Sequence, residues 1–299
     1  MKHTIRNEAV SFVSDSFNVE PWDLHFNEES VNYFWRPQEV KKLGTAVCFP
    51  LMGTVPGGKY KFDGKEYSLG MHGFAQDREF AVAEKIEDRI VYELNDDKDS
   101  YTRFPWHFNF RLAYTIRGAG LKTEYLIKNR DEKEMYCTVG GHPRYACPVG
   151  DGSRFEDYFF EFENSERIEN IYKSYGPVEE IAKCLSPDGK KIHLDYRMFT
   201  KGCFCFHPIN SRSVVLKNKK NGRGLNINIG DASHLQFWTE PGAPFICIEP
   251  IYGSTSHLPL LPEDADWKER PGTLRVKPGE TKICSFYTEI TKENVKEQK

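Results

Sequence analysis

The chain has 299 residues, of which 39% are hydrophobic and 14% aromatic, and this is enough to fill a large core. Its formal net charge of -3 argues against nucleic acid or an anionic membrane as the main partner. No apolar run approaches the roughly 20 residues needed to span a bilayer. Residues 1–8 contain no apolar stretch typical of a signal peptide. We therefore expect a cytoplasmic protein, and either a monomer or a homodimer fits this composition.

Glycine-containing dipeptides suited to tight turns recur along the chain, and most are flanked by runs rich in β-branched and aromatic residues. They are Asp63-Gly64, Asp151-Gly152, Asp188-Gly189 and Asn221-Gly222. The first and last lie between apolar–polar alternations that predict hairpins at 60–69 and 214–229. Lysines and Arg223 near the tip of the later hairpin fit a solvated turn better than an anion site.

Further runs predict strands of five or six residues. They are Ile90–Leu94, His107–Leu112, Thr123–Ile127, Tyr158–Phe162, His234–Trp238 and Ile283–Tyr287. Helical patterns are scarce, and the best is a short turn from Glu263 to Arg270 that ends before Pro271-Gly272. Many short strands without alternating helices predict an antiparallel all-β fold. With no repeat or linker, residues 1–299 are expected to form a single domain with a core at about 44–289 and a polar tail at 291–299.

The eight cysteines occur in apolar contexts and include no C-x-x-C pair. This pattern argues against a zinc ribbon or a redox motif and favours free thiols packed in the core.

Three ionisable side chains stand beside glycine or proline, the residues that a tightly shaped site requires. Glu249 ends the apolar run that begins at Phe245 and precedes Pro250, which restricts the backbone before it to extended geometry. His142 is likewise followed by a proline and preceded by two glycines, and His72 precedes Gly73. Taken alone, each histidine is more often structural than catalytic. Together, His72, His142 and Glu249 predict a shared site.

The blocks around these residues resemble the signature blocks of the aldose 1-epimerase (galactose mutarotase) family, in order and with similar separations. The blocks are Met71-His72-Gly73-Phe74-Ala75, Val139-Gly140-Gly141-His142-Pro143 and Cys247-Ile248-Glu249-Pro250. The similarity is closest to the bacterial branch with H-G-F-A and G-G-H-P blocks, and it runs from about Gly44 to Glu289. It implies a galactose mutarotase-like β-supersandwich that is antiparallel and has few, short helices.

The resemblance also implies roles. His142 would act as the general acid on the sugar ring oxygen, Glu249 as the base on the anomeric hydroxyl, and His72 as a hydrogen-bonding support. These roles suit mutarotation, because opening a hemiacetal removes a proton from the C1 hydroxyl and adds one to the ring oxygen. The expected activity is that of an aldose 1-epimerase on a hexose or hexose derivative, with a small carbohydrate as partner and neither cofactor nor metal.

Several sugar contacts of the family are replaced in this chain. Thr54 and Gln76 stand where the family usually has arginine, Gly202 where it commonly has aspartate, and Ile251 where tryptophan often follows the E-P pair. Losing such a contact typically costs about a kcal/mol or more of binding, so the usual galactose or glucose pose is not expected.

Other side chains are candidates to replace these contacts. We expect Gln76, Arg78, Trp238 and Tyr252 to contact the substrate; Asp195 and Arg144 could add polar contacts, and Phe74 and Tyr145 could stack on it.

Two alternatives remain open. Two histidines and a glutamate could bind a divalent ion as a facial triad. The chain could also be a carbohydrate-binding protein of the same fold that is non-catalytic or has an altered sugar specificity.

Overall fold

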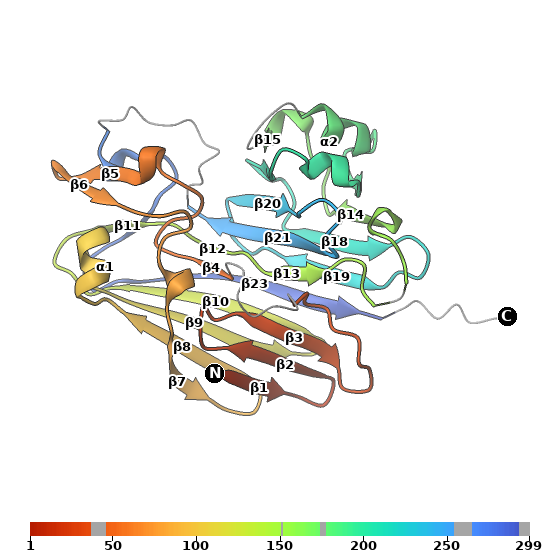
Figure 1. Cartoon of the computed structure of the whole chain (residues 1–299), viewed down its shortest axis with the longest axis horizontal. Helices are drawn as coiled ribbons and strands as arrows, with labels where there is room; N and C mark the ends of the chain where they lie inside the picture. Colours follow the sequence, from red (N-terminus) through yellow and green to blue (C-terminus); the bar gives the residue numbers. More distant parts are fainter. Residues whose placement is uncertain (37–45, 151, 174–177, 254–264, 293–299) are drawn as a thin grey trace.

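Antiparallel strands make up most of the computed structural model, which describes residues 1–36, 46–150, 152–173, 178–253 and 265–292 (Figure 1). Every ladder between named strands in these ranges is antiparallel. Two short α-helices accompany them, α1 (Lys98–Arg103) and α2 (Glu179–Cys184). Neither has the length or apolar character to cross a bilayer.

The larger of two extended sheets has nine strands. In spatial order they are β16 (Lys191–His193), β14 (Tyr158–Phe162), β18 (Ser213–Asn218), β19 (Gly224–Asn228), β23 (Thr281–Thr291), β10 (Gly120–Asn129), β9 (Phe108–Arg117), β8 (Arg89–Asn95) and β7 (Ala81–Lys85). Burial alternates along β23, where Cys284, Phe286, Thr288 and Ile290 are buried. Such alternation is expected when only one face of a sheet packs on a core.

The second extended sheet has seven strands. They are β15 (Ile171–Lys173), β17 (Phe204–Phe206), β20 (His234–Trp238), β21 (Phe245–Tyr252), β12 (Val139–Gly141), β4 (Val47–Cys48) and β13 (Arg144–Ala146), the last of which pairs with β21 beyond the end of β12. All eight residues of β21 are buried. A strand covered on both faces reads as a continuous apolar run, which explains the sequence around Glu249.

Smaller sheets complete the molecule. They are formed by β1 (Lys2–Arg6), β2 (Val10–Asp15) and β3 (Pro21–Phe26), by β5 (Lys59–Phe62) with β6 (Lys65–Ser68), and by β11 (Met135–Cys137) with β22 (Leu274–Val276). The first contributes Ile5, Val10 and Phe12 to the core, which therefore extends well before residue 44.

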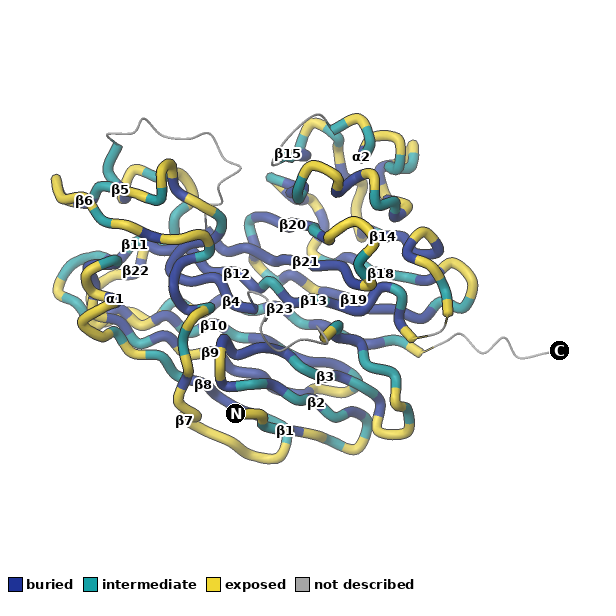
Figure 2. Tube along the Cα trace, in the orientation of Figure 1, coloured by how far each residue is buried: buried dark blue, intermediate teal, exposed yellow. Residues whose placement is uncertain are grey.

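The main hydrophobic core lies between the two extended sheets, where the buried parts of the trace concentrate (Figure 2). Phe160 on β14 contacts Phe237 on β20 with ring centroids 4.3 Å apart. A Cβ added at Gly141 on β12 would lie 2.7 Å from the Tyr125 hydroxyl of β10. The two layers thus meet at van der Waals distance, and glycine is required where β12 approaches β10.

Most predicted strands and both predicted hairpins are confirmed. The hairpin at Asp63-Gly64 joins β5 to β6, and the one at Asn221-Gly222 joins β18 to β19. Asp188-Gly189 forms a turn closed by a bond from the Ser186 N–H to the Lys191 carbonyl. Asp151 and residues 263–264 lie outside the described residues. Within the predicted helical turn at 263–270, the described part holds a single 3-10 turn, Trp267–Glu269.

Candidate functional site

Glu249 lies in the middle of the seven-stranded sheet, on the face opposite the main core. Ile246, Ile248 and Tyr252 on β21 belong to that core, whereas Ile251 packs with Cys48 and Met52 in a separate small cluster. Because side chains alternate along a strand, Glu249 shares a face with Cys247 and Ile251. Its side chain is fully buried, so its carboxyl group must find partners within the protein.

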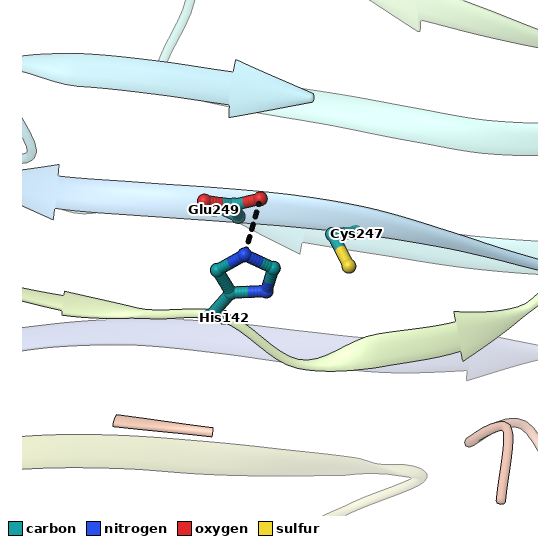
Figure 3. Close-up of side chains that lie close together, drawn as sticks. All are labelled: His142, Cys247 and Glu249. Atoms are coloured by element: carbon teal, nitrogen blue, oxygen red, sulfur yellow. Dashed lines mark ion pairs between the residues drawn. The ribbon is translucent and has the colours of Figure 1, made fainter. Parts of the chain in front are cut away.

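Two neighbouring side chains contact the Glu249 carboxyl group. Gln236 lies directly opposite on β20, and its Nε2 donates a hydrogen bond to Glu249 Oε2 at 2.7 Å. His142 Nε2 lies 3.4 Å from Glu249 Oε1. Figure 3 shows the imidazole pointing at the carboxyl group, with Cys247 further along the same strand. The predicted acid and base are therefore adjacent.

The position of His142 is set by the junction between β12 and β13. Gly140 pairs with Ile251 on β21 and with Cys48 on β4, and the His142 N–H donates to the Ala46 carbonyl at 2.9 Å. A Cβ on Gly140 would lie 3.3 Å from the Pro250 carbonyl oxygen, which is tight for any side chain. The two glycines thus allow the backbone before His142 to lie close to β21 in the same sheet and to β10 in the facing sheet.

His72 approaches the pair from a tight turn after β6. His72 and Gly73 both have left-handed backbone, with φ of 64° and 74°. The His72 ring is 5.5 Å from the His142 ring, centroid to centroid, in an edge-to-face arrangement. The Gly53 N–H donates to His72 Nδ1 at 3.2 Å, so the neutral ring carries its proton on Nε2. The structure therefore brings together all three residues predicted to be catalytic.

Burial works against charge on every one of these groups. It lowers the pKa of His142 to about 3, with smaller contributions from His72 and Arg144 in the same direction. It lowers the pKa of His72 to about 4 and raises that of Glu249 well above its usual range. The hydrogen bond from Gln236 and the charge of Arg144 oppose the shift at Glu249. Burial therefore favours neutral imidazoles and a protonated Glu249.

Of the four predicted substrate contacts, Trp238 lies beside His142 and Glu249. Its ring centroid is 5.8 Å from that of His142, and it also contacts Phe245. Tyr252 points to the opposite face of β21, because it is three residues from Glu249 on an alternating strand. Its hydroxyl donates to the Ile229 carbonyl at 3.1 Å in the core.

Gln76 and Arg78 bind other parts of the protein. The Gln76 amide donates to the carbonyls of Met71 and Gly73, at 2.6 and 3.3 Å, and so holds the turn that carries His72. Arg78 forms ion pairs with Asp97, at 3.2 Å, and with Asp99. A substrate role for these two side chains would require breaking those bonds.

Three other candidates are also engaged elsewhere. Asp195 forms an ion pair with Arg197 at 2.6 Å. Phe74 and Tyr145 are 1% exposed and belong to the main core. Neither ring is therefore free to stack on a sugar.

Sequence reasoning missed Gln236, which holds the carboxyl group of Glu249. A signal was present, because Gln236 is two residues before Trp238 in a predicted strand and must share its face. The pairing of β20 with β21, which places Gln236 opposite Glu249, is a long-range feature that no local pattern specifies.

A metal site formed by His72, His142 and Glu249 was an open alternative, and a different set of three ligand atoms, with Cys247 in place of His72, lies close together. His142, Cys247 and Glu249 offer atoms within 4.8 Å of one another. However, burial raises the pKa of the Cys247 thiol well above its usual range, whereas a thiolate is the form that binds metal. Arg144 adds a positive charge to the same surroundings. This chemistry favours proton transfer over binding of a divalent cation, and the absence of a metal stays a prediction.

Comparison with known proteins adds independent information. A model of the aldose 1-epimerase family matches residues 19–283. Protein LacX (chromosomal) of Lactococcus lactis subsp. lactis is 28% identical over 274 residues, covering 87% of this chain and 90% of LacX. Among solved structures, a galactose mutarotase related enzyme from Lactobacillus acidophilus superposes with a TM-score of 0.86 and 23% identity over 98% of both chains. A galactose mutarotase-like protein from Lactobacillus casei gives 0.83 and 21%, over 97% of this chain and all of the other.

Proposed function

Because the chain belongs to the aldose 1-epimerase family, we propose that it interconverts the α and β anomers of a hexose or hexose derivative by opening and reclosing the sugar ring. One observation supports this most directly: His142 Nε2 and Glu249 Oε1 lie 3.4 Å apart on one face of the seven-stranded sheet. An acid and a base must flank the C1–O5 edge of the sugar, and this pair offers both in hydrogen-bonding reach of one small group.

In the proposed reaction, Glu249 takes the proton of the C1 hydroxyl while His142 gives a proton to the ring oxygen. The C1–O5 bond breaks, its electron pair remains on O5, and the C1–O1 bond becomes a carbonyl. Rotation about C1–C2 presents the other face of the aldehyde to O5. Ring closure then reverses both proton transfers, so each residue serves once as donor and once as acceptor in a turnover.

This sequence of transfers needs a single proton on the His142–Glu249 pair. Opening begins with a protonated imidazole and a carboxylate, and it ends with a neutral imidazole and a carboxylic acid. Burial favours the second distribution, since it lowers the pKa of His142 and raises that of Glu249. A bound sugar would favour the first, because its C1 hydroxyl donates to the carboxylate and its ring oxygen accepts from the imidazolium.

Three further residues complete the proposed site. His72 contacts the His142 ring and would position it or bind a substrate hydroxyl through Nε2. Trp238, beside His142, would provide an apolar surface for the sugar ring. Gln236 holds Glu249 Oε2 and leaves Oε1 facing His142.

The test is anomer exchange measured by polarimetry and by NMR on a panel of hexoses and hexose derivatives. We expect the wild type to accelerate exchange of at least one sugar and His142→Ala to lose most of that acceleration, about 10²–10⁴-fold. His107→Ala is the matched control, because His107 is exposed and paired with Asp96 away from this site. It should retain full activity.

The same assay separates catalysis from simple binding. If the wild type accelerates no exchange but a sugar still perturbs its NMR spectrum, the protein is a carbohydrate-binding member of the family and the enzymatic proposal fails. If His142→Ala is as active as the wild type, the assigned roles are incorrect even though the reaction occurs.

A further inference from the structure

Arg144 is a half-buried arginine next to the proposed catalytic pair, and the proposed reaction has not used it. It lies on β13 directly opposite Cys247 of β21, and therefore on the same face as Glu249. Its guanidinium carbon is 5.7 Å from the centroid of the Trp35 ring and 5.6 Å from that of Phe245. In the part of the chain that the structure describes, its buried Nε and Nη1 atoms have no hydrogen-bond partner. Such a charge is costly to bury unless other charges compensate it.

Two buried carboxyl groups lie within the electric field of Arg144, although no ion pair among the described residues joins it to either of them. Glu249 is fully buried and Glu20, just before β3, is 5% exposed. The charge of Arg144 lowers the pKa of both carboxyl groups against the larger effect of burial. Arg144 is thus a fixed positive charge shared between Glu20 and the proposed base.

The other titratable groups around Glu249 do not supply such a charge. They are His142 between β12 and β13, His72 from the turn after β6, Cys247 on β21, Cys48 on β4 and Cys205 on β17. Burial keeps both imidazoles neutral and raises the pKa of all three thiols well above the usual value. Asp15 acts on Glu20 from β2, in the direction that opposes ionisation.

We propose that Arg144 is a positioning residue of the proposed catalytic pair: its positive charge, on a half-buried side chain, stabilises the carboxylate form of Glu249 and so makes that group available as a base. This inference rests on the proposed function. Arg144 acts from the neighbouring strand, through the electric field in a poorly hydrated region, where a charge has a larger effect than in water. Trp35 and Phe245 keep the guanidinium beside the sheet by packing against it.

The test is the pH dependence of kcat/KM in two charge-removing variants, Arg144→Met and Arg144→Gln, with Arg144→Lys as the charge-preserving control. Removing a nearby cation raises the pKa of every neighbouring acid. The whole pH–rate profile should therefore move to higher pH by on the order of one pH unit. At a fixed pH on either sloping limb of the profile, this shift changes kcat/KM about tenfold. Arg144→Lys should keep the wild-type profile. A purely structural role would lower the melting temperature but leave the position of the profile unchanged, and that result would overturn the inference.

A second measurement does not depend on activity. Infrared difference spectra report the protonated carboxyl band of Glu249, which Glu249→Gln identifies by removing it. In the wild type this band should disappear at lower pH than in the charge-removing variants. If those variants do not fold, titration of the Glu249 band in the wild type still tests the inference. A band that stays unchanged over the pH range in which the wild type is active, or in which it stays folded, contradicts the inference. A wild type that converts no sugar refutes the proposed function, whereas an active wild type with unshifted variants refutes only the role of Arg144.

Discussion

At the scale of single residues, the paired shifts at His142 and Glu249 define the site more sharply than either residue alone. A lowered pKa favours the neutral form of His142, and a raised pKa favours the neutral form of Glu249. His142 Nε2 and Glu249 Oε1 are 3.4 Å apart. Pairs of titratable groups whose pKa values are driven apart by their surroundings are typical of acid–base catalysis.

Glu249→Gln should separate chemistry from binding. The substitution keeps the side-chain shape and an oxygen that can accept the bond from Gln236, but it removes the proton acceptor. We expect kcat to fall about 10²–10⁴-fold while sugar affinity, measured by calorimetry, changes little. Glu161→Gln, which changes a half-exposed carboxylate paired with Lys191, is the control. A parallel loss of affinity and rate in Glu249→Gln would show that Glu249 mainly binds the substrate.

Glu20→Gln should stabilise the protein above acidic pH. Burial raises the pKa of Glu20 from 4.5 to about 8, so between these values the unfolded chain has released a proton that the folded chain retains. Stability contributed by this group is present below pH 4.5 and is lost as pH rises to about 8. The gain from Gln should therefore be near zero at low pH and reach roughly a few kcal/mol above the folded pKa.

Urea denaturation at several pH values measures this difference. Gln retains an oxygen that can accept the 3.0 Å bond from Asn18 Nδ2, so the comparison isolates the charge. Glu8→Gln, at an exposed carboxylate, should show no such pH dependence. A Glu20→Gln variant that is equally destabilised at every pH would show that the Glu20 side chain makes a favourable interaction that does not depend on its charge.

At the scale of elements, local patterns predicted strands well and short helices poorly. The alternation at β10 and β23 and the turn glycines are local signals, and they predicted the strands and hairpins correctly. α1 and α2 have only six residues each, too few for a helical hydrophobic period to stand out. The N-terminal sheet of β1, β2 and β3 was also not predicted, although it contributes Phe12 and Leu24 to the core.

The turn carrying His72 can be tested with a matched pair of glycine substitutions. Gly64 and Gly73 both have φ of 74°, where any other residue is strained. A Cβ at Gly64 meets no atom within 4 Å, whereas one at Gly73 would lie 2.3 Å from the Phe49 carbonyl oxygen. Gly64→Ala should cost about 1–2 kcal/mol. Gly73→Ala should cost more and also displace His72.

The two alanine variants should therefore differ in activity as well as in stability. We expect Gly64→Ala to keep wild-type kcat/KM and Gly73→Ala to lose at least tenfold, because small displacements of catalytic groups are costly. Thermal melts give the stabilities, and anomer exchange gives the rates. Equal melting temperatures for the two variants would contradict the steric argument at Gly73.

At the scale of the whole molecule, the site is assembled from segments far apart in sequence. His72 comes from a turn after β6, His142 from the β12–β13 junction, Gln236 from β20 and Glu249 from β21. The three signature blocks allowed the sequence to predict that His72, His142 and Glu249 meet. Which strands pair is decided by long-range packing, so the sequence did not reveal that Tyr252 faces the core, that Arg78 binds Asp97, or that Gln236 lies opposite Glu249.

The pH dependence of catalysis follows from the burial of the whole site. The one-proton form of the His142–Glu249 pair exists between two apparent pKa values that belong to the pair. Burial lowers the pKa of His142 to about 3 and raises that of Glu249, so it widens this window on both sides. In solution, by comparison, an ordinary glutamate and histidine would hold one proton only between about pH 4.3 and 6.5.

We therefore expect a bell-shaped profile of kcat/KM that is broader than these two values allow, with its acid limb below the pKa of an ordinary glutamate. Anomer exchange measured across pH, with circular dichroism to confirm that the protein stays folded, checks this. Glu249→Gln should replace the bell-shaped profile of any residual activity with a single titration, that of His142. A profile as narrow as that of the free side chains would show that water reaches the pair during catalysis and that burial does not set its protonation.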